Sequence, residues 1–325
     1  MNRSKLIGII VLSIMLGSCN FSNDFSGSDH QGIAWDTIEG PAKGVLLQTD
    51  ELVSAYISNR PLQVWLPSTY DSKRKHAVLY MYDGQMLFDA SNAWNHKEWR
   101  VDEVIDSLMG LNEILPTIVV ALHNGGQQRS FEYFPQKPYN ELNVAFSDSM
   151  MADISKDYSS DGVFNVKSDD YLSYIIEEVM PVINESFHVN EDKSATVIAG
   201  SSMGGLMSMY AIGEYPNIFG SAICMSTHWP GGYAPNADVP KVFQSYIADN
   251  IKQDRVGKIY FDYGTETLDE MYEPFQMQVD SIIELNGFQK DVNWSTKKFQ
   301  GAAHDELSWA KRLYIPLLFA LKKQR

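Results

Sequence analysis

VIAGSSMGGLMSMY, residues 197–210, starts as a β-branched apolar run, passes through a cluster of small residues and ends with helical character. Within it, Gly200, Ser202 and Gly204 have the spacing Gly-x-Ser-x-Gly. Glycines let a strand and the following helix approach closely, and the strained turn between them lifts a serine hydroxyl clear of the sheet. The stretch therefore predicts a strand-to-helix turn with Ser202 as a nucleophile. A glycine-rich turn that only caps a helix is the structural alternative.

Strand-like and helix-like segments alternate along the rest of the chain. The strand-like segments are residues 45–58 and 60–67, which suggest a hairpin, then 76–83, 117–123, 194–200, 219–226, 258–264 and 292–299. The helix-like segments are residues 168–187, 203–214, 270–286 and a last stretch that begins near Asp305. This alternation predicts an α/β fold with a mostly parallel central sheet and helices on both faces. Ligands of such sheets bind beyond the carboxyl ends of the strands.

One connection in this pattern is unusually long. More than forty residues, 124–168, separate the strand-like segment 117–123 from the next helix-like segment, and they include seven aromatic residues. Loops of this length are usually functional or disordered, and the aromatic content speaks against disorder. We expect this loop to carry the substrate specificity.

The composition excludes several classes of function. The 325 residues are 44% hydrophobic, enough for a large core, and we assign residues 41–325 to one domain. Lys and Arg number 26 against 41 Asp and Glu, a net charge of -15, so no nucleic acid partner is expected. Because the sequence contains no metal-ligand spacing and no dinucleotide or phosphate loop, we expect no cofactor and no metal. Nothing in the sequence sets the oligomeric state.

Residues 1–19 have the features of a signal peptide. Two cations precede an apolar run, residues 6–16, that is short for a membrane span. The ending Leu-Gly-Ser-Cys resembles the bacterial lipobox, after which Cys19 becomes a lipid-modified N-terminus. Residues 20–40, rich in Ser, Asn, Asp and Gly, suit a flexible tether. We therefore expect a lipoprotein of the bacterial cell envelope that contacts the membrane through its lipid anchor alone.

A serine hydroxyl becomes a nucleophile when a base takes its proton. Among the seven histidines, His304 follows the last strand-like segment in a loop of small residues at the carboxyl edge of the predicted sheet. The serine, acid, histidine order of such sites favours His304 as the base. His123 and His228 also follow strand-like segments, and we expect them to line the pocket.

Four ordered stretches resemble the α/β-hydrolase-fold esterases that include the esterase D, feruloyl esterase, enterochelin esterase and mycobacterial antigen 85 groups. They are YMYDGQMLF at 80–88, GSSMGG at 200–205, FDYGTETLDEMY at 261–272 and GAAHDELSW at 301–309. The resemblance spans about residues 62–321 and implies an α/β-hydrolase fold in which the serine attacks an ester carbonyl. The four stretches are specific for the family and leave the substrate open.

The resemblance also implies how the oxyanion of the reaction is stabilised. The backbone N–H groups of Met203, directly after the nucleophile, and of Gln85 are the expected donors. A further segment, residues 124–135, looks like the family's Arg-x-x-Glu-Tyr-x-Pro stretch. There we expect Arg129 and Glu132 to hold the loop by a salt bridge, with substrate contact by Arg129 as the alternative.

The acid of the triad has two candidates. Many relatives place it three residues past the glycine that corresponds to Gly264, where this chain has Thr267. The neighbouring carboxylates are Glu266, two residues past that glycine, and Asp269, five residues past it. We favour Asp269, for which capping of the following helix is the structural alternative. Glu266, with its longer side chain, stays a competitor.

Together these features predict a serine esterase that acts through an acyl-enzyme on a small-molecule or glycan ester of the sugar, hydroxycinnamate or siderophore type. The expected catalytic residues are Ser202, His304 and Asp269. The expected substrate contacts are Trp94, Trp229, His228 and Arg129. Two alternatives are an acyltransferase with the same triad and a non-catalytic lipoprotein that binds at the cell surface.

Overall fold

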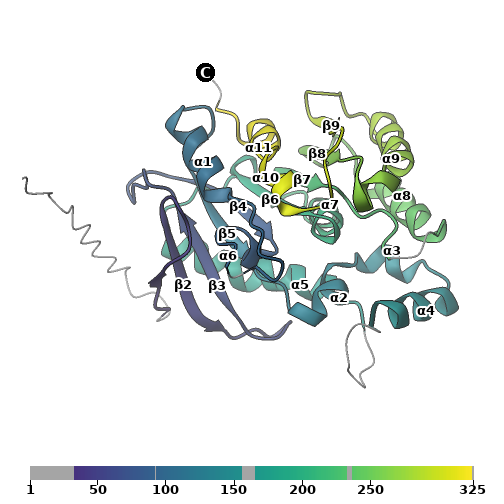
Figure 1. The fold of residues 1–325 in the computed structure, drawn as a ribbon, viewed down its shortest axis with the longest axis horizontal. Helices are drawn as coiled ribbons and strands as arrows, with labels where there is room; N and C mark the ends of the chain where they lie inside the picture. Colours follow the sequence, from purple (N-terminus) through teal and green to yellow (C-terminus); the bar gives the residue numbers. More distant parts are fainter. Residues whose placement is uncertain (1–32, 92, 156–164, 233–235, 324–325) are drawn as a thin grey trace, which may run out of the picture.

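The computed structural model describes residues 33–91, 93–155, 165–232 and 236–323. The predicted signal peptide, Cys19 and most of the predicted tether lie outside these residues. The described chain folds into one sheet with helices packed against both faces (Figure 1). The expected α/β class is therefore confirmed.

In the described residues the sheet has nine strands in the order β1-β2-β3-β5-β4-β6-β7-β8-β9. The pairs β1–β2, β2–β3 and β3–β5 are antiparallel, and β4 to β9 are mutually parallel. Their bounds are β1 Asp36–Ile38, β2 Val45–Leu52, β3 Arg60–Leu66, β4 Ala77–Tyr82, β5 Thr117–Leu122, β6 Thr196–Ser201, β7 Ser221–Met225, β8 Lys258–Tyr263 and β9 Trp294–Lys298. The carboxyl ends of the parallel strands share one edge of the sheet, where the predicted site residues are expected.

Helices connect the strands. Their bounds are α1 Val101–Gly110, α2 Arg129–Tyr133, α3 Gln136–Asn140, α4 Val144–Ser155, α5 Ser168–Ser173, α6 Met180–Ser186, α7 Met203–Glu214, α8 Asp238–Asn250, α9 Glu273–Leu285, α10 Glu306–Ala310 and α11 Tyr314–Leu321. Two short 3-10 helices, η1 Gly84–Met86 and η5 Thr267–Met271, follow β4 and β8. Both of these turns carry predicted site residues.

Two hydrophobic cores lie on opposite faces of the sheet. On β4, Leu79 and Met81 belong to one buried cluster, whereas Tyr80 and Tyr82 belong to the other, as the period of two in a strand requires. Apolar side chains of α1, α10 and α11 complete the first cluster. Those of α2 and α5 to α9 complete the second. Figure 1 shows α1 and α11 on the other side of the sheet from α5 and α6.

Several parts of the structure differ from the sequence-based expectation. Residues 36–38, placed in the tether, form β1 and pair with β2, so the folded body begins before residue 41. The long aromatic loop contains α2, α3 and α4. Within the helical stretch 168–187, a π-helical segment, Tyr174–Val179, precedes α6, and Pro181 follows it in the first turn of α6. The helix continues through this point, since the Met180 N–H donates to the Ile175 carbonyl, five residues back. Pro181 therefore lies where the π-helical bonding pattern changes to the α-helical one, and irregular bonding of this kind is where a helix interior can accommodate a proline.

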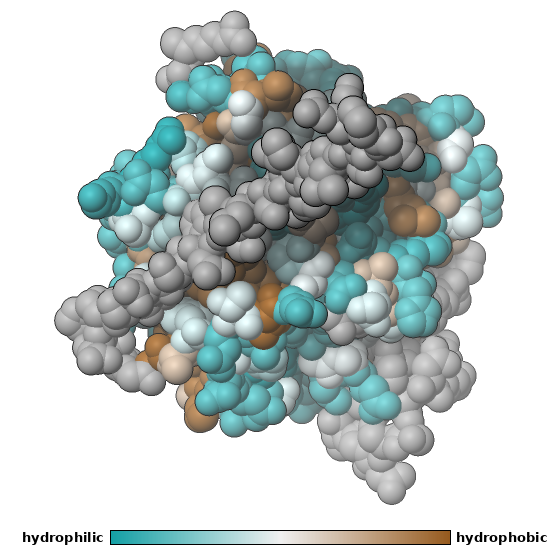
Figure 2. Space-filling model, turned by 60° about the vertical axis from the view of Figure 1, so that its left-hand side comes forward, coloured by the Kyte–Doolittle hydropathy of each residue, from teal (hydrophilic) through white to brown (hydrophobic). Residues whose placement is uncertain are grey.

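In the view of Figure 2, the hydrophobic side chains that are visible form small patches among hydrophilic ones. Within the described ranges, no helix combines the length and the apolar character needed to cross a bilayer.

Candidate active site

Ser202 sits at the sharp turn between β6 and α7. Its backbone has φ 57° and ψ -120°, a conformation that is strained for a residue with a side chain. The Ser202 N–H donates to the Met225 carbonyl at 3.0 Å, which fastens the turn to β7. A Cβ atom on Gly200 would lie 2.7 Å from the Gly204 backbone, so the close approach of strand and helix requires glycine. The predicted turn geometry is thus present.

His304 is held by Asp269. The Asp269 Oδ1 atom lies 2.5 Å from Nδ1 of His304. The Asp269 side chain is fully buried, whereas that of His304 keeps 13% of its surface exposed. Glu266, the competing acid, is exposed, and its backbone N–H donates to the Ala302 carbonyl. The geometry therefore places Asp269 as the carboxylate that orients the imidazole.

Asp269 stays ionised despite its burial. Desolvation alone would raise the pKa of its carboxyl, but hydrogen bonds from His304, Ser226 and the Gly264 N–H outweigh it and hold the pKa below the ordinary value. Its Oδ2 atom accepts from Ser226 Oγ and from Gly264 N, each at 2.6 Å. A carboxylate with this many donors remains a charged partner for His304.

Further buried hydrogen bonds hold Asp269 through its Oδ2 atom. Ser226 Oγ, which donates to Asp269, itself accepts from Trp309 Nε1 at 2.9 Å and from Arg312 Nη2 at 2.8 Å. Arg312 also pairs with Asp262, a fully buried carboxylate, at 2.9 Å. Burial raises the pKa of Asp262, and the Arg312 charge acts against that rise. Each of these residues is buried and bonded, although Nη1 of Arg312 has no hydrogen-bond partner among the described residues. The bonds to Ser226 fix the position of the acid.

The second expected oxyanion donor lies on the turn that follows β4. Asp83 has φ 58°, and Gln85 is the middle residue of the 3-10 helix η1. Met203 is the first residue of α7. The N–H groups of Gln85 and Met203 therefore both belong to first helical turns, where an N–H has no partner within its own helix. A Cβ atom on Gly204 would lie 3.2 Å from the Tyr82 Cβ, which places the two turns against each other.

Arg129 stabilises the turn that follows β4. Its Nε and Nη2 atoms contact the two oxygens of Asp83 at 2.6 and 2.7 Å, and Asn124 donates to the same carboxylate at 2.7 Å. The expected salt bridge between Arg129 and Glu132 is wrong in its pairing, because Glu132 instead receives two hydrogen bonds from the buried Arg60. The topology explains the difference, since β4 and β5 are neighbours and bring Asp83 next to the start of the long segment.

The other predicted substrate contacts divide into exposed and buried side chains. Trp94 is 84% exposed. The next residue, Asn95, donates to Glu306 at 2.8 Å, so this loop lies beside the start of α10, close to His304 in the chain. Trp229 is fully buried among core aromatics and donates to Gln276 at 3.0 Å. We therefore correct Trp229 from a substrate contact to a core residue.

His228 is also buried, but it faces the site. Its backbone N–H donates to the Ser202 carbonyl at 3.2 Å, and its Nδ1 lies 2.7 Å from the Tyr272 hydroxyl. Burial, helped by the electrostatic effects of nearby His304 and Arg129, lowers the pKa of His228 to about 3. The ring is therefore neutral at pH 7.

Tyr272 connects the groups of the site. Its hydroxyl lies 2.7 Å from His228 Nδ1. Its ring meets the His304 ring edge to face, with centroids 5.7 Å apart. Tyr272 thus contacts both His304 and His228, the residue whose backbone bonds to Ser202, and it directly follows the turn that carries Asp269.

The sequence interpretation assigned no role to Tyr272, Ser226, Arg312 or Asp83. Ser226 could have been found, because it directly follows β7 at the same sheet edge as Ser202 and His304. The Thr267 hydroxyl accepts from the His304 N–H at 2.9 Å. It fixes the backbone of the histidine.

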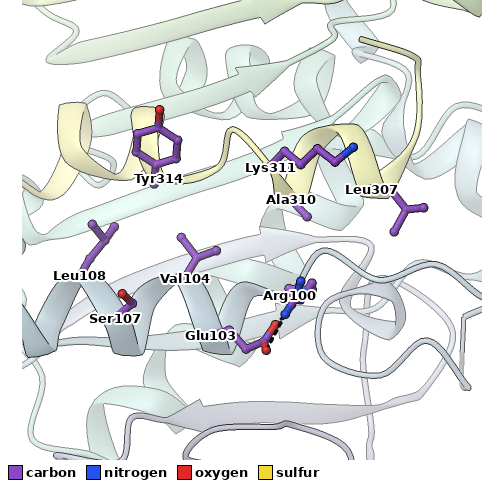
Figure 3. Close-up of a pocket in the computed structure, with 9 residues that line it drawn as sticks. All are labelled: Arg100, Glu103, Val104, Ser107, Leu108, Leu307, Ala310, Lys311 and Tyr314. Atoms are coloured by element: carbon purple, nitrogen blue, oxygen red, sulfur yellow. Dashed lines mark hydrogen bonds and ion pairs between the residues drawn. The ribbon is translucent and has the colours of Figure 1, made fainter.

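Two cavities lie near these elements. One of about 250 Å³ borders the turn after β4 and is lined in part by Gln85 and His123, and its lining includes neither Ser202 nor His304. The other, of about 560 Å³, lies between α1 and the α10–α11 segment, where Val104 and Leu108 face Ala310 and Tyr314 (Figure 3). Its lining includes none of the predicted site residues.

Comparisons with known proteins bear on the family and on the fold. The family model described as "Putative esterase" matches residues 54–317. A ferulic acid esterase structure has a TM-score of 0.57 at 19% identity, covering 85% of this chain and 97% of the other. The enterobactin esterase FES from Shigella flexneri has a TM-score of 0.57 at 16% identity, covering 86% and 60%. At these identities the likeness shows a shared fold, which is the expected α/β-hydrolase fold.

One further structure and one sequence relative extend the comparison. An IroE-like serine hydrolase from Shewanella oneidensis has a TM-score of 0.58 at 15% identity, covering 88% of this chain and 79% of the other. "Uncharacterized protein YbbA" from Bacillus subtilis (strain 168) is 28% identical over 174 residues, or 53% of this chain. That alignment spans 58% of the Bacillus protein, less than two thirds of its length.

Proposed function

The chain belongs to the esterase family, and from that premise we propose that it is a serine ester hydrolase with Ser202, His304 and Asp269 as its triad. The observation that carries the proposal is the 2.5 Å contact between Asp269 and His304 beside a serine in the strained strand-to-helix turn. These are the three roles that acyl transfer requires: a nucleophile, its base, and a carboxylate that orients the base.

The proposed reaction has two halves. Ser202 Oγ attacks the ester carbonyl while His304 Nε2 takes its proton, because Nδ1 is engaged by Asp269. The backbone N–H groups of Gln85 and Met203 stabilise the oxyanion. His304 then protonates the departing alcohol, and water releases the acyl group from Ser202. Asp269 keeps the imidazole in the required tautomer and stabilises its charged form.

The proposed substrates are esters of sugars, hydroxycinnamates or siderophores. Two structures with the same fold are titled as a ferulic acid esterase and an enterobactin esterase, which supports aromatic acyl groups. The exposed Trp94, on a loop tied to α10, supplies a flat apolar surface on which an aromatic or sugar ring can lie. Turnover of acetyl, feruloyl and siderophore esters, measured side by side, ranks these classes.

We also propose that the protein is lipid-anchored in the cell envelope, because residues 16–19 match the lipobox pattern. Metabolic labelling with a fatty acid should mark the wild type and leave Cys19→Ala unmarked. An unmodified N-terminus on the wild-type protein would contradict the anchor without touching the catalytic proposal.

The nucleophile is tested by labelling with a fluorophosphonate, which reacts only with an activated serine. We expect labelling and turnover in the wild type and in Ser201→Ala, and the loss of both in Ser202→Ala. The Ser201 variant is a close control because Ser201 precedes the nucleophile and is buried at the end of β6. An unlabelled wild type would favour a non-catalytic binding protein.

A further inference from the structure

The residues that follow the exposed Trp94 are fastened to the start of α10. Asn95 Nδ2 donates to Glu306 Oε2 at 2.8 Å. Lys97 Nζ pairs with Asp305 Oδ2 at 2.9 Å. Both carboxylates belong to the two residues that directly follow the proposed base in the chain. The segment that carries Trp94 is therefore held on the side of the site where the base lies.

Trp99 ties the same segment, residues 93–99, to both halves of the site. Its ring stacks on the ring of Trp309 with centroids 5.0 Å apart, and Trp309 meets the His304 ring edge to face, also at 5.0 Å. The Trp99 backbone N–H donates to the Met86 carbonyl at 3.0 Å, in the turn that presents the expected oxyanion donor. Segment 93–99 is thus fixed to the oxyanion turn as well as to the base.

Trp94 lies at the bend of segment 93–99. The His96 N–H donates to the Ala93 carbonyl at 3.0 Å, which closes a turn around Trp94 and Asn95. The Trp94 side chain is 84% exposed. A single exposed apolar side chain needs no explanation by itself. Here, however, the flat indole belongs to a turn that is anchored next to the base, where a ring of the substrate can reach it.

The geometry of ester hydrolysis sets which part of a substrate lies on this side. The carbonyl oxygen of the bound ester faces the expected N–H donors, Gln85 and Met203. The alcohol oxygen lies beside His304 Nε2, which protonates it as it leaves. Ser202 and His304 are both only partly buried, so an ester can reach them. The alcohol part of the ester is therefore the part next to segment 93–99.

On the basis of the proposed function, we infer that Trp94 determines specificity for the alcohol part of the ester, and that this part carries a ring, as a sugar or an aryl alcohol does. The ring of the alcohol lies on the indole while Ser202 Oγ bonds to the carbonyl carbon. The bond from that carbon to the alcohol oxygen then breaks, and the proton that His304 took from Ser202 passes to the alcohol oxygen. Trp94 exchanges no proton and contributes binding to the alcohol alone.

The test compares two isomeric esters that carry one phenyl group on opposite sides of the ester bond. Benzyl acetate has the ring on the alcohol, methyl phenylacetate has it on the acyl group, and methyl acetate has no ring. Methanol and benzyl alcohol are leaving groups of similar basicity. We therefore expect the wild type to hydrolyse benzyl acetate with a higher kcat/KM than methyl acetate.

Replacing the indole should remove this advantage. We expect Trp94→Ala to lower the ratio of kcat/KM for benzyl acetate to kcat/KM for methyl acetate about fivefold, the effect of one aromatic contact. The ratio of methyl phenylacetate to methyl acetate should stay within about twofold of the wild-type value. Damage to the folded fraction cancels in both ratios. Trp94→Phe keeps a ring and should largely preserve the benzyl acetate ratio.

Matched variants test whether the anchored turn places the indole. Asn95→Asp sets a second carboxylate against Glu306, releases the turn and should lower the benzyl acetate ratio as Trp94→Ala does. Glu306→Gln keeps an acceptor for Asn95 and should preserve the ratio. Tyr314→Ala removes another exposed aromatic side chain, which lines the cavity between α1 and α11, and should leave the ratio unchanged.

Two results overturn the role of Trp94 and leave the esterase intact. One is a Trp94→Ala loss that falls on methyl phenylacetate, or on neither ester. The other is a wild type that fluorophosphonate labels but that hydrolyses benzyl acetate no faster than methyl acetate. Absence of both labelling and ester hydrolysis from the wild type overturns the proposed function itself, and this inference with it.

Discussion

Oδ1 of Asp269 lies 2.5 Å from Nδ1 of His304, while its other oxygen accepts from Ser226 and from the Gly264 backbone. The carboxylate is thus held on both sides, and the imidazole follows it. The turn that carries Asp269 also carries Thr267, whose hydroxyl accepts from the His304 backbone. One short turn after β8 therefore sets both the ring and the main chain of the base.

This arrangement predicts unequal effects for the two candidate acids. Asp269→Asn should lower kcat by about 10⁴, as removal of a triad acid does in serine proteases, because the amide favours the wrong imidazole tautomer. Glu266→Gln should change kcat little, because Glu266 is exposed. Steady-state kinetics on one ester compare the two. A large loss confined to Glu266→Gln would reverse the assignment, and small losses in both would indicate a Ser-His dyad.

The contact between Arg129 and Asp83 predicts a kcat effect without a KM effect. Arg129→Met should relax the turn that presents Gln85 and lower kcat by roughly tenfold to a hundredfold, less than the loss of a whole oxyanion donor. Lys137→Met, which breaks an ion pair whose lysine is 56% exposed, serves as the control and should be near neutral. If KM rises while kcat holds, Arg129 binds substrate directly.

The sequence predicted the structure best where all the residues that determine a feature lie within one short stretch. The glycine spacing around Ser202 predicts its turn because the backbones of Gly200 and Gly204 touch within four residues. The helical spacing of the apolar residues Val101, Ile105 and Leu108 was also present in the sequence. It marks α1, a helix that the sequence analysis did not predict. Pairs that join distant strands were beyond this kind of inference.

Asp83 and Arg129 are a pair of this kind, which the sequence alone does not reveal. They are 46 residues apart and meet only because β4 and β5 pair. Arg129 and Glu132 are one helical turn apart, so local spacing favoured the wrong partner. The prediction of Trp229 as a substrate contact was wrong for a related reason. It follows β7 like a site residue, but its side chain turns into the core.

The buried Asp262–Arg312 pair predicts non-additive stability changes. Arg312→Met leaves the Asp262 carboxylate buried without its charge partner and should lower the free energy of unfolding by about 3–5 kcal/mol. Adding Asp262→Asn removes the stranded charge, so the double variant should be more stable than Arg312→Met alone. Urea denaturation at pH 7 measures all three proteins. A double variant no more stable than the single would show that the two side chains are not energetically coupled.

His228 predicts how stability depends on pH. Its pKa is about 3 in the folded protein and about 6.5 when unfolded, so between these values the unfolded chain binds one more proton. Stability from this group is therefore present above pH 6.5 and is lost as the pH falls toward 3. Between pH 7 and pH 5 the loss amounts to about 2 kcal/mol.

The variant His228→Asn separates the contribution of His228 to the pH dependence of stability from the contribution of the carboxylates. His228→Asn cannot titrate, so its free energy of unfolding should fall by about 2 kcal/mol less than that of the wild type between pH 7 and pH 5. His188→Asn is the control, because His188 is exposed and should leave the wild-type slope unchanged. Urea titrations at pH 7, 6 and 5 supply the slopes. Equal slopes for wild type and His228→Asn would mean that His228 takes up a proton in the folded protein as readily as in the unfolded chain.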